Sequence, residues 1–311
     1  MLTCCDDRWL HAPITRRKSL QALVLAATEG FASVLVAANA ELRVITSGEN
    51  EATRQILEVM ARRLRGFVSD SDARALAQRR GPAVYVSLGP AALQAGLGLS
   101  LGGPLLSLFT SNEVYTRLVT VSGSSLRQQT GAIFAEASPQ SQMELIRAIY
   151  TRKVDVAVLL SESTANQEAS IRRAARANDL DIDVQFVNQG ESAVRALTRV
   201  RSATVLLTVP DRDLYTAESL RDILESTYRR GQAVIGFTPS LVTAGTLAAA
   251  YASIDDTVAH AAELVTAMTG GQPLEPRYPL YWRVAINDTV ARSLNLVVAD
   301  RVRGLGNPPP P

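Results

Sequence analysis

The residues of this sequence that could do chemistry are mostly small polar side chains that directly follow short apolar runs. Their hydroxyl, amide and carboxylate groups can donate or accept hydrogen bonds, which suits the binding of a polar solute. The candidate ligand-binding residues are Ser47, Gly48, Gly89, Pro90, Thr110, Ser111, Ser161, Glu162, Ser163, Asp211, Tyr215, Thr238 and Tyr251. Residues of the same types also cap helices and form turns, so capping is the alternative role for each of them.

Two carboxylates belong to this set, Glu162 and Asp211. We interpret them as a helix cap and a contact for a ligand ammonium group, and not as a catalytic acid and base. Tyr215, Tyr251 and Phe237 are the aromatic residues expected in the wall of the site. For Phe237, packing in the core is an equal alternative.

Residues suited to catalysis or metal binding are scarce. The only cysteines are adjacent, at Cys4 and Cys5, and the only histidines are His11 and His260. Adjacent thiols near the N-terminus cannot supply a four-ligand metal site. The serines of 122–125 lack the Gly-x-Ser-x-Gly pattern of a nucleophile elbow, and no histidine stands in a suitable partner position. We therefore expect no enzymatic activity, no cofactor and no metal.

Two further features have plain structural interpretations. The glycines of 96–103 approach a dinucleotide-binding pattern, but the last glycine comes one position late and the stretch does not directly follow a strand. We interpret this stretch as a flexible surface connection.

His260 falls inside a late helical pattern, where we expect a solvated or capping side chain.

The composition indicates a chain with room for two domains. It has 311 residues, of which 47% are hydrophobic, and a formal net charge of +2. A chain of this length can bury a substantial core and divide into two units. The small net charge is spread along the sequence without a basic block, so nucleic acid is not an expected partner.

The N-terminus has the pattern of an export signal. Basic residues at 16–18 precede an apolar stretch from Leu20 to Ala38, and residues 38–40 form a small-x-small cleavage pattern. We expect cleavage near Ala40 and a periplasmic protein, by either the Sec or the twin-arginine route. The alternative is an amphipathic first helix from Leu20 to Val36.

Beyond the signal, short apolar runs alternate with helical patterns. Strands are predicted at Leu42 to Thr46, Pro82 to Leu88 and Leu105 to Phe109. Each is a near-continuous apolar run, as in a parallel sheet that is covered on both faces. The interval between the first two strands is short and leaves little room for an additional β–α unit.

A second alternation begins near residue 141, and this restart predicts two doubly wound α/β lobes with parallel sheets. The predicted strands are Val154 to Leu160, Leu180 to Phe186, Ala203 to Val209 and Ala233 to Phe237. The predicted helices are Ser141 to Tyr150, Asn166 to Ala177, Glu218 to Arg230 and Asp255 to Thr269. In such sheets ligands bind beyond the carboxyl ends of the strands, where the candidate residues stand.

Several segments of the second half resemble a known family. These are Val158 to Asn166, Gly236 to Gly245 and Arg283 to Asn287, in an order that covers roughly Ser138 to Asn295. They are similar to ABC-transporter solute-binding proteins, a mostly uncharacterised family with some members that bind aromatic amino acids. Where that family has Tyr-Asn-Pro after the strand, this chain has Leu160-Ser161-Glu162.

The resemblance implies a type I periplasmic-binding fold whose lobes close on a ligand by a hinge. It places residues 41–137 and 253–279 in an N-terminal lobe and residues 138–252 and 280–302 in a C-terminal lobe. Residues 303–311 would be a disordered tail. The hinge segments would lie near 134–139, 249–252 and 279–282.

The function implied by the resemblance is capture of a small polar or aromatic solute, an amino acid or a similar molecule, in the cleft between the lobes. The protein would be a monomer that delivers this solute to the membrane permease of an ABC transporter. A periplasmic ligand sensor for a membrane signalling partner is the first alternative. A nucleotide-dependent α/β enzyme is the second.

Overall fold

The computed structural model describes residues 40–64, 66–123, 130–269 and 273–310. The predicted export signal, apart from Ala40, therefore lies outside the described residues. No helix within the described ranges is long and apolar enough to cross a membrane.

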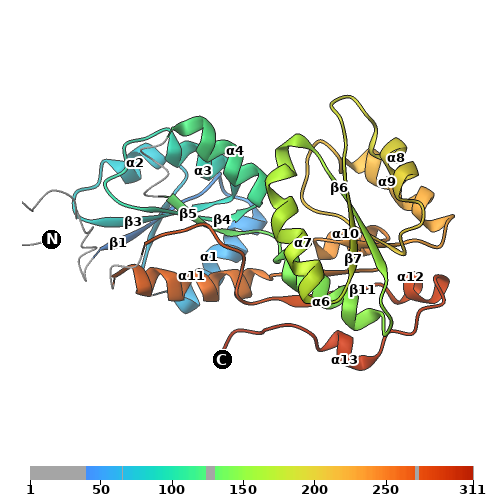
Figure 1. The fold of residues 1–311 in the computed structure, drawn as a ribbon. Coiled ribbons are helices and arrows are strands. Elements are labelled where there is room, and N and C mark those ends of the chain that lie inside the picture. Colours follow the sequence, from blue (N-terminus) through green and yellow to red (C-terminus); the bar gives the residue numbers. More distant parts are fainter. Residues whose placement is uncertain (1–39, 65, 124–129, 270–272, 311) are drawn as a thin grey trace, which may run out of the picture. The chain divides into compact units, whose positions relative to one another are not determined.

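A five-stranded parallel sheet organises the first half of the chain, in the order β2-β1-β3-β4-β5 (Figure 1). Its strands are β1 (Glu41–Ile45), β2 (Val68–Asp70), β3 (Ala83–Leu88), β4 (Leu105–Thr110) and β5 (Thr130–Phe134). Every residue of β3 and β5 is buried, which explains their near-continuous apolar sequences.

Helices cover both faces of this sheet. They are α1 (Glu51–Arg63), α2 (Ala73–Ala77), α3 (Gly89–Leu97), α4 (Asn112–Ser122) and the late helix α11 (Ile254–Thr269). On one face Met60 of α1 and Val258 of α11 share a hydrophobic cluster with the strands. On the other face Leu93 of α3 and Tyr115 of α4 share a second cluster. We call this sheet with its five helices the first lobe.

The interval between the first two long strands was predicted to leave little room for an additional β–α unit, but it contains one. The unit is present as β2 and α2, with only three and five residues. Both elements are too short to show a periodic pattern, and the strand is held by pairing with β1 from Arg43↔Val68 to Ile45↔Asp70.

A six-stranded sheet organises the second half, in the order β11-β10-β9-β8-β6-β7. All its pairings are parallel except that of β10 with β11. Its strands are β6 (Asp155–Leu160), β7 (Asp181–Phe186), β8 (Val205–Leu207), β9 (Ala233–Gly236), β10 (Ala248–Tyr251) and β11 (Arg283–Ile286).

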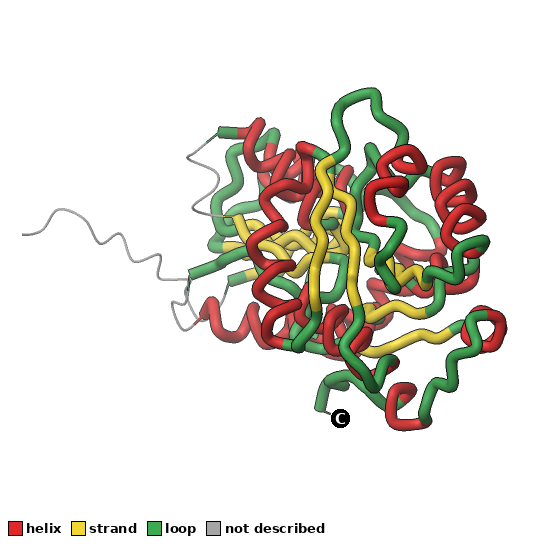
Figure 2. The backbone as a smooth tube through the Cα atoms, turned by 45° about the vertical axis from the view of Figure 1, so that its right-hand side comes forward, coloured by secondary structure: helices red, strands yellow, loops and turns green. Residues whose placement is uncertain are grey.

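Helices lie on both sides of these strands as well, as Figure 2 shows. They are α6 (Pro139–Ile149), the 3₁₀ helices η1 (Glu162–Gln167) and η2 (Leu197–Val200), α7 (Glu168–Ala177), α8 (Ala193–Ala196), α9 (Ala217–Tyr228), α10 (Pro239–Ala244), α12 (Asp288–Ser293) and α13 (Asp300–Arg303). Ile146 of α6 packs on one face and Ile223 of α9 on the other. We call this sheet with its helices the second lobe, and the predicted doubly wound α/β architecture is confirmed.

The chain segments that link the two lobes lie beside one another. Glu136, just after β5, forms an antiparallel backbone bridge with Tyr251 at the end of β10. Ile133 of β5 forms a parallel bridge with Arg277, which follows α11. The numbered lobe boundaries given above stay predictions, but these bridges bring all three connections to the end of the first sheet.

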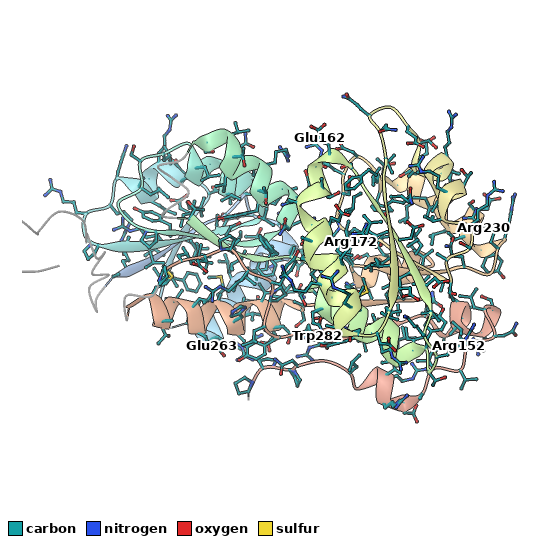
Figure 3. The ribbon with its side chains drawn as sticks, viewed as in Figure 1. Arg152, Glu162, Arg172, Arg230, Glu263 and Trp282 are labelled. Atoms are coloured by element: carbon teal, nitrogen blue, oxygen red, sulfur yellow. The ribbon has the colours of Figure 1, made fainter. Side chains whose placement is uncertain are left out.

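The segment predicted as a disordered tail is ordered in part, contrary to expectation. Asn307 and Trp282 exchange two backbone hydrogen bonds of 2.9 and 3.0 Å, and Leu305 packs against the core of the second lobe. Trp282 is buried next to this segment (Figure 3). The proline run suggested disorder, but the residues before it are anchored by backbone pairing that sequence composition does not reveal.

Candidate functional site

A small cavity lies where the lobes meet, just beyond the carboxyl ends of β5, β8 and β9. Its volume is about 20 Å³. The residues that line it are Glu136, Ala137, Pro139, Gln142, Gln167, Ile171, Leu207, Thr208, Val209, Pro210, Phe237 and Tyr278. Sites that hold a small organic ligand measure roughly 300 Å³ or more. A solute that needs a site of that volume could therefore enter only if the two lobes separate.

Glu136 places a buried carboxyl group against this cavity. The residue is 4% exposed, and its Oε1 accepts a hydrogen bond from the backbone N–H of Asn112 at 3.0 Å. Its Oε2 is buried without a partner among the described residues. Burial raises the pKa of Glu136 to about 7, although hydrogen bonds from backbone N–H groups oppose the rise. Nearby Glu113 raises it further.

Gln167 provides the second unpaired polar group at the cavity. It is 4% exposed at the end of η1, and its Nε2 is buried without an acceptor in the described part of the chain. Gln142, which lines the same cavity, differs because both ends of its amide are used. Its Nε2 donates to the Ala250 carbonyl at 2.9 Å, and its Oε1 accepts from the Ala250 N–H at 3.2 Å. One acceptor and one donor are thus left free for a bound molecule.

Aromatic side chains complete the lining. The Tyr278 ring packs edge-on against Phe134 with centroids 5.0 Å apart, and its hydroxyl is 3.5 Å from Asn112 Nδ2. Phe237, one of the predicted wall residues, lines the cavity. Tyr215 and Tyr251 are not among the lining residues. The Tyr215 hydroxyl is buried without a partner in the described chain, and burial together with Asp211 raises its pKa.

None of the predicted ligand-binding residues belongs to the lining of this cavity. Ser111, Ser161 and Thr238 instead cap α4, η1 and α10 by accepting backbone N–H bonds. Gly89 and Pro90 begin α3, Glu162 and Ser163 lie on η1, and Thr110 and Tyr251 are the last residues of β4 and β10. The others, Ser47, Gly48, Asp211 and Tyr215, lie in the loops after β1 and β8. Their contact with a ligand stays a prediction. For Ser111, Ser161 and Thr238, the structure shows the alternative role, that of a helix cap.

Glu162 and Asp211 lie in different surroundings. Glu162 is exposed on η1 (Figure 3). Asp211 is 3% exposed, and donors of the second lobe satisfy both of its carboxylate oxygens. It has no free oxygen for a ligand ammonium group in this arrangement, so it supports the loops beside the cavity.

The residues that sequence analysis missed are Glu136, Gln167 and Tyr278. Glu136 fell inside a predicted hinge segment because the strand before it, Thr130–Phe134, was not predicted. A carboxylate two residues past an apolar run was the available signal. Gln167 and Tyr278 gave no signal, since only the tertiary fold brings them to the cavity.

Two structural interpretations were also wrong. His260 is neither solvated nor a cap, because it is buried and its Nδ1 accepts the N–H of Leu280 at 3.1 Å. Burial lowers the pKa of His260.

The 96–103 stretch is not a simple flexible connection, since Gly96 packs inside α3 against Leu105. A Cβ on Gly103 would lie 1.9 Å from the Ala83 carbonyl oxygen.

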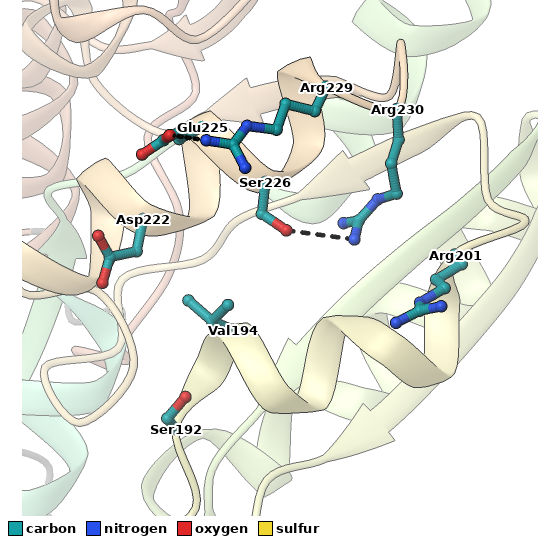
Figure 4. Close-up of a pocket in the computed structure, with 8 residues that line it drawn as sticks. All are labelled: Ser192, Val194, Arg201, Asp222, Glu225, Ser226, Arg229 and Arg230. Carbon is teal, nitrogen blue, oxygen red and sulfur yellow. Dashed lines mark hydrogen bonds and ion pairs between the residues drawn. The ribbon is translucent and has the colours of Figure 1, made fainter.

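A larger hollow of about 750 Å³ lies between α8 and α9 and is shown in Figure 4. Its charged groups are mixed, because Arg229 pairs with Glu225 and Asp222 lines the same hollow as Arg201 and Arg230. None of its lining residues directly follows the carboxyl end of a strand, as Phe237 of the small cavity does. Within the described ranges, no cluster of three or more His, Cys, Asp or Glu side chains could hold a metal ion.

Comparison with solved structures identifies the fold. A substrate-binding protein with adhesive properties from Clostridium difficile, in its ligand-free open structure, matches with a TM-score of 0.62 and 12% identity over 85% of this chain and 98% of that one. An ABC domain in complex with L-Trp from Streptococcus pneumonia matches with a TM-score of 0.54 and 15% identity over 85% and 97%. The chain has the type I periplasmic-binding fold.

A conserved domain protein from Vibrio cholerae shares this type I periplasmic-binding fold with a TM-score of 0.53 and 17% identity, over 85% of this chain and 97% of the other. No protein-family model matches the chain, and no curated protein sequence matches it. The cavity lies beyond the carboxyl ends of strands, which is where open α/β sheets generally bind their ligands.

Proposed function

We propose that this chain is an extracytoplasmic solute-binding protein that captures a small solute between its lobes and delivers it to an ABC permease. The observation that carries the proposal is the pair of unpaired buried groups, Glu136 Oε2 and Gln167 Nε2, in one cavity. Each buried polar group without a partner costs about 1–3 kcal/mol. A solute that supplies both partners recovers this cost.

The mechanism is closure of the lobes around the solute. A ligand shifts such an equilibrium only by binding the closed form better than the open form. Here Glu136 lies in a connection between the lobes and Gln167 lies on η1 of the second lobe. A solute that enters between separated lobes can contact both groups once the lobes close on it, with more space between them than the present cavity of about 20 Å³. The Clostridium difficile protein of the same fold is described in a ligand-free, open structure, which supports a fold that opens.

Export to the periplasm is the second part of the proposal. The basic residues at 16–18, the following apolar stretch and the small-x-small pattern at 38–40 support it. The first sheet begins at Glu41, immediately after the proposed cleavage site, so removal of the signal leaves β1 whole. Delivery to an ABC permease rests on the sequence resemblance and on the ABC domain with L-Trp that shares the fold.

A thermal-shift screen of the purified full chain against amino acids, amines, sugars and polyols tests solute binding. A ligand at 100 times its Kd should add about 2.7 kcal/mol of stability. Small-angle scattering should then show a smaller radius of gyration with the hit than without it. A screen without any hit, or a hit that leaves the radius unchanged, contradicts closure on a solute.

Cell fractionation tests the export part separately. We expect the protein in the periplasmic fraction, with Glu41 as the N-terminal residue by mass spectrometry. Recovery of the uncleaved chain from the cytoplasm would contradict export and leave solute binding untouched.

A further inference from the structure

We infer that the solute is a protonated organic amine with an apolar body, held by Glu136, and that the site does not select a carboxylate. This inference rests on the proposed function, because it names the chemical class of the molecule bound in that cavity. Its first support is the unpaired Oε2 of Glu136, a buried acceptor at the cavity that an N–H donor would satisfy.

The charge of the cavity favours a cation. Glu136 is the one ionisable carboxyl group among the lining residues, and no lysine, arginine or histidine is among them. Glu113 lies close by in α4, is buried, and has Arg117 as its partner at 3.4 Å. An ammonium group beside Glu136 would therefore neutralise a buried negative charge, whereas a ligand carboxylate would add a second one.

The helix N-termini beside the cavity, which could otherwise bind a carboxylate, already hold groups of the protein. Glu136 itself accepts the Asn112 N–H at the start of α4. Ser138, Ser161 and Thr238 accept the N–H groups of Ser141, Ser163 and Leu241 at the starts of α6, η1 and α10. The uncapped start of α3 does not line the cavity. Among the side chains that line the cavity, Gln167 Nε2 is the unpaired donor that an amino-acid carboxylate would find, and it lies in the same cavity as a carboxyl group.

The remaining lining specifies the body of the amine. Ile171, Leu207 and Val209 are apolar, and Phe237 and Tyr278 present aromatic rings. Aromatic rings attract ammonium groups, and apolar walls favour a hydrocarbon or aryl body. The free Nε2 of Gln167 can donate to one ether or hydroxyl oxygen on that body.

Isothermal titration calorimetry of the full chain at pH 8 with four matched probes tests the inference. The probes are 2-phenylethylamine, 2-phenylethanol, 3-phenylpropanoate and L-phenylalanine, which share one aryl body and differ in the polar group. We expect 2-phenylethylamine to bind about 10- to 100-fold more tightly than each of the others, the range expected for one charged hydrogen bond.

Variants identify the anchor. Glu136→Gln should weaken 2-phenylethylamine by about 10- to 100-fold, while Glu218→Gln, which alters an exposed carboxylate on α9, should leave its affinity unchanged. Unfolding of Glu136→Gln would be seen by circular dichroism. In that case Gln167→Leu provides the second test, because it should weaken 4-methoxyphenethylamine more than 2-phenylethylamine.

The outcomes separate this inference from the proposed function. Tighter binding of L-phenylalanine or 3-phenylpropanoate than of the amine, or a screening hit without an amino group, overturns the amine class and leaves solute binding standing. Unchanged affinity in folded Glu136→Gln also overturns it. If none of the four probes binds and the thermal-shift screen finds no ligand, the proposed function itself is contradicted.

Discussion

The Thr164 hydroxyl donates a hydrogen bond to Asp211 Oδ2 at 2.6 Å, and this bond joins η1 to the loop after β8. The same oxygen accepts the Ser161 N–H at 3.1 Å, while Oδ1 accepts the N–H groups of Asp213 and Leu214 at 3.0 and 3.2 Å. Asp211 thus fixes two loops of the second lobe that border the cavity.

Replacement of Asp211 by alanine should lower the free energy of unfolding by about 3 kcal/mol, since hydrogen bonds to a buried charged group contribute about 1.5–3 kcal/mol. Urea denaturation measures the change. Asp213→Ala is the matched control, because Asp213 is exposed and accepts one bond from Ser163. It should change stability by less than about 0.5 kcal/mol. Equal losses in both variants would show that Asp211 has no special supporting role.

The stability of the ligand-free protein should fall as the pH rises from about 4.5 to about 7 because of Glu136. Burial raises the pKa of this group from 4.5 to about 7, so the folded state binds a proton that the unfolded state has lost in this interval. The cost is fully present above pH 7 and absent below the unfolded pKa. A difference of this size between the pKa values of the folded and unfolded states corresponds to about 3 kcal/mol in the free energy of unfolding.

Thermal unfolding of Glu136→Gln and of the unaltered protein between pH 4.5 and 8 measures this contribution. The variant should lose part of the pH dependence, because it has no proton to release. Glu218→Gln, which changes an exposed carboxylate, should keep the full dependence. Parallel profiles for the two proteins would mean that Glu136 keeps an ordinary pKa in the folded state.

The fold was predictable from the sequence where burial imposes a pattern. Strands such as β3 and β6 are covered on both faces, so apolar residues fill them and they stand out. Strand β10 reads Ala-Ala-Ala-Tyr and β2 reads Val-Ser-Asp, sequences with little β propensity. They are strands because pairing with neighbouring strands determines their conformation.

The site was predictable only as a region. The polar residues after the strands were correctly placed at the ends of the sheets, but no sequence feature shows which of them are used as caps. The side-chain oxygens of Ser111 and Thr238 accept backbone N–H bonds from the first turns of α4 and α10. Whether Glu136 or Asp211 keeps a free oxygen depends on donors supplied by distant segments, such as Asn112 for the first and Thr164 for the second.

The ion pair of Asp256 with Arg283 should stabilise the connection between the lobes. Asp256 lies on α11 of the first lobe and is fully buried, while Arg283 lies on β11 of the second. Arg283 Nε is 2.8 Å from Oδ2 and Nη2 is 2.9 Å from Oδ1. Because Arg283 is half-exposed, we expect Asp256→Asn to cost about 2 kcal/mol in urea denaturation at pH 7.

This cost should shrink in acid. Burial raises the pKa of Asp256, but the bonds from Arg283 and Ser253 outweigh it, so the folded pKa lies below 3.8. The stabilisation is therefore present above pH 3.8 and lost as the pH falls through the folded pKa. Asp255→Asn, which removes a pair with Arg63 inside the first lobe, should cost less. A loss for Asp256→Asn that does not change between pH 7 and pH 3 would contradict the assignment.

Arg43 should be the most sensitive position in the first sheet, because it is a charged residue buried in strand β1 with 1% exposure. Its Nη1 donates to the carbonyls of Leu76 and Arg79 at 3.2 and 3.0 Å, and its Nη2 donates to the Arg80 carbonyl at 3.0 Å. The guanidinium fork thereby holds the segment between α2 and β3.

Arg43→Lys should lower the free energy of unfolding by about 3 kcal/mol, because a single ammonium group cannot reach the carbonyls on either side of the fork and leaves buried acceptors unpaired. Arg79→Lys is the control, since Arg79 is exposed and pairs with Glu41 at 2.7 Å. Surface pairs of this kind contribute about 0–1 kcal/mol. Urea denaturation measures the stability of both variants, and hydrogen exchange of the amides of residues 76–81 should increase only in Arg43→Lys. Undiminished protection there would mean that the fork does not hold this segment.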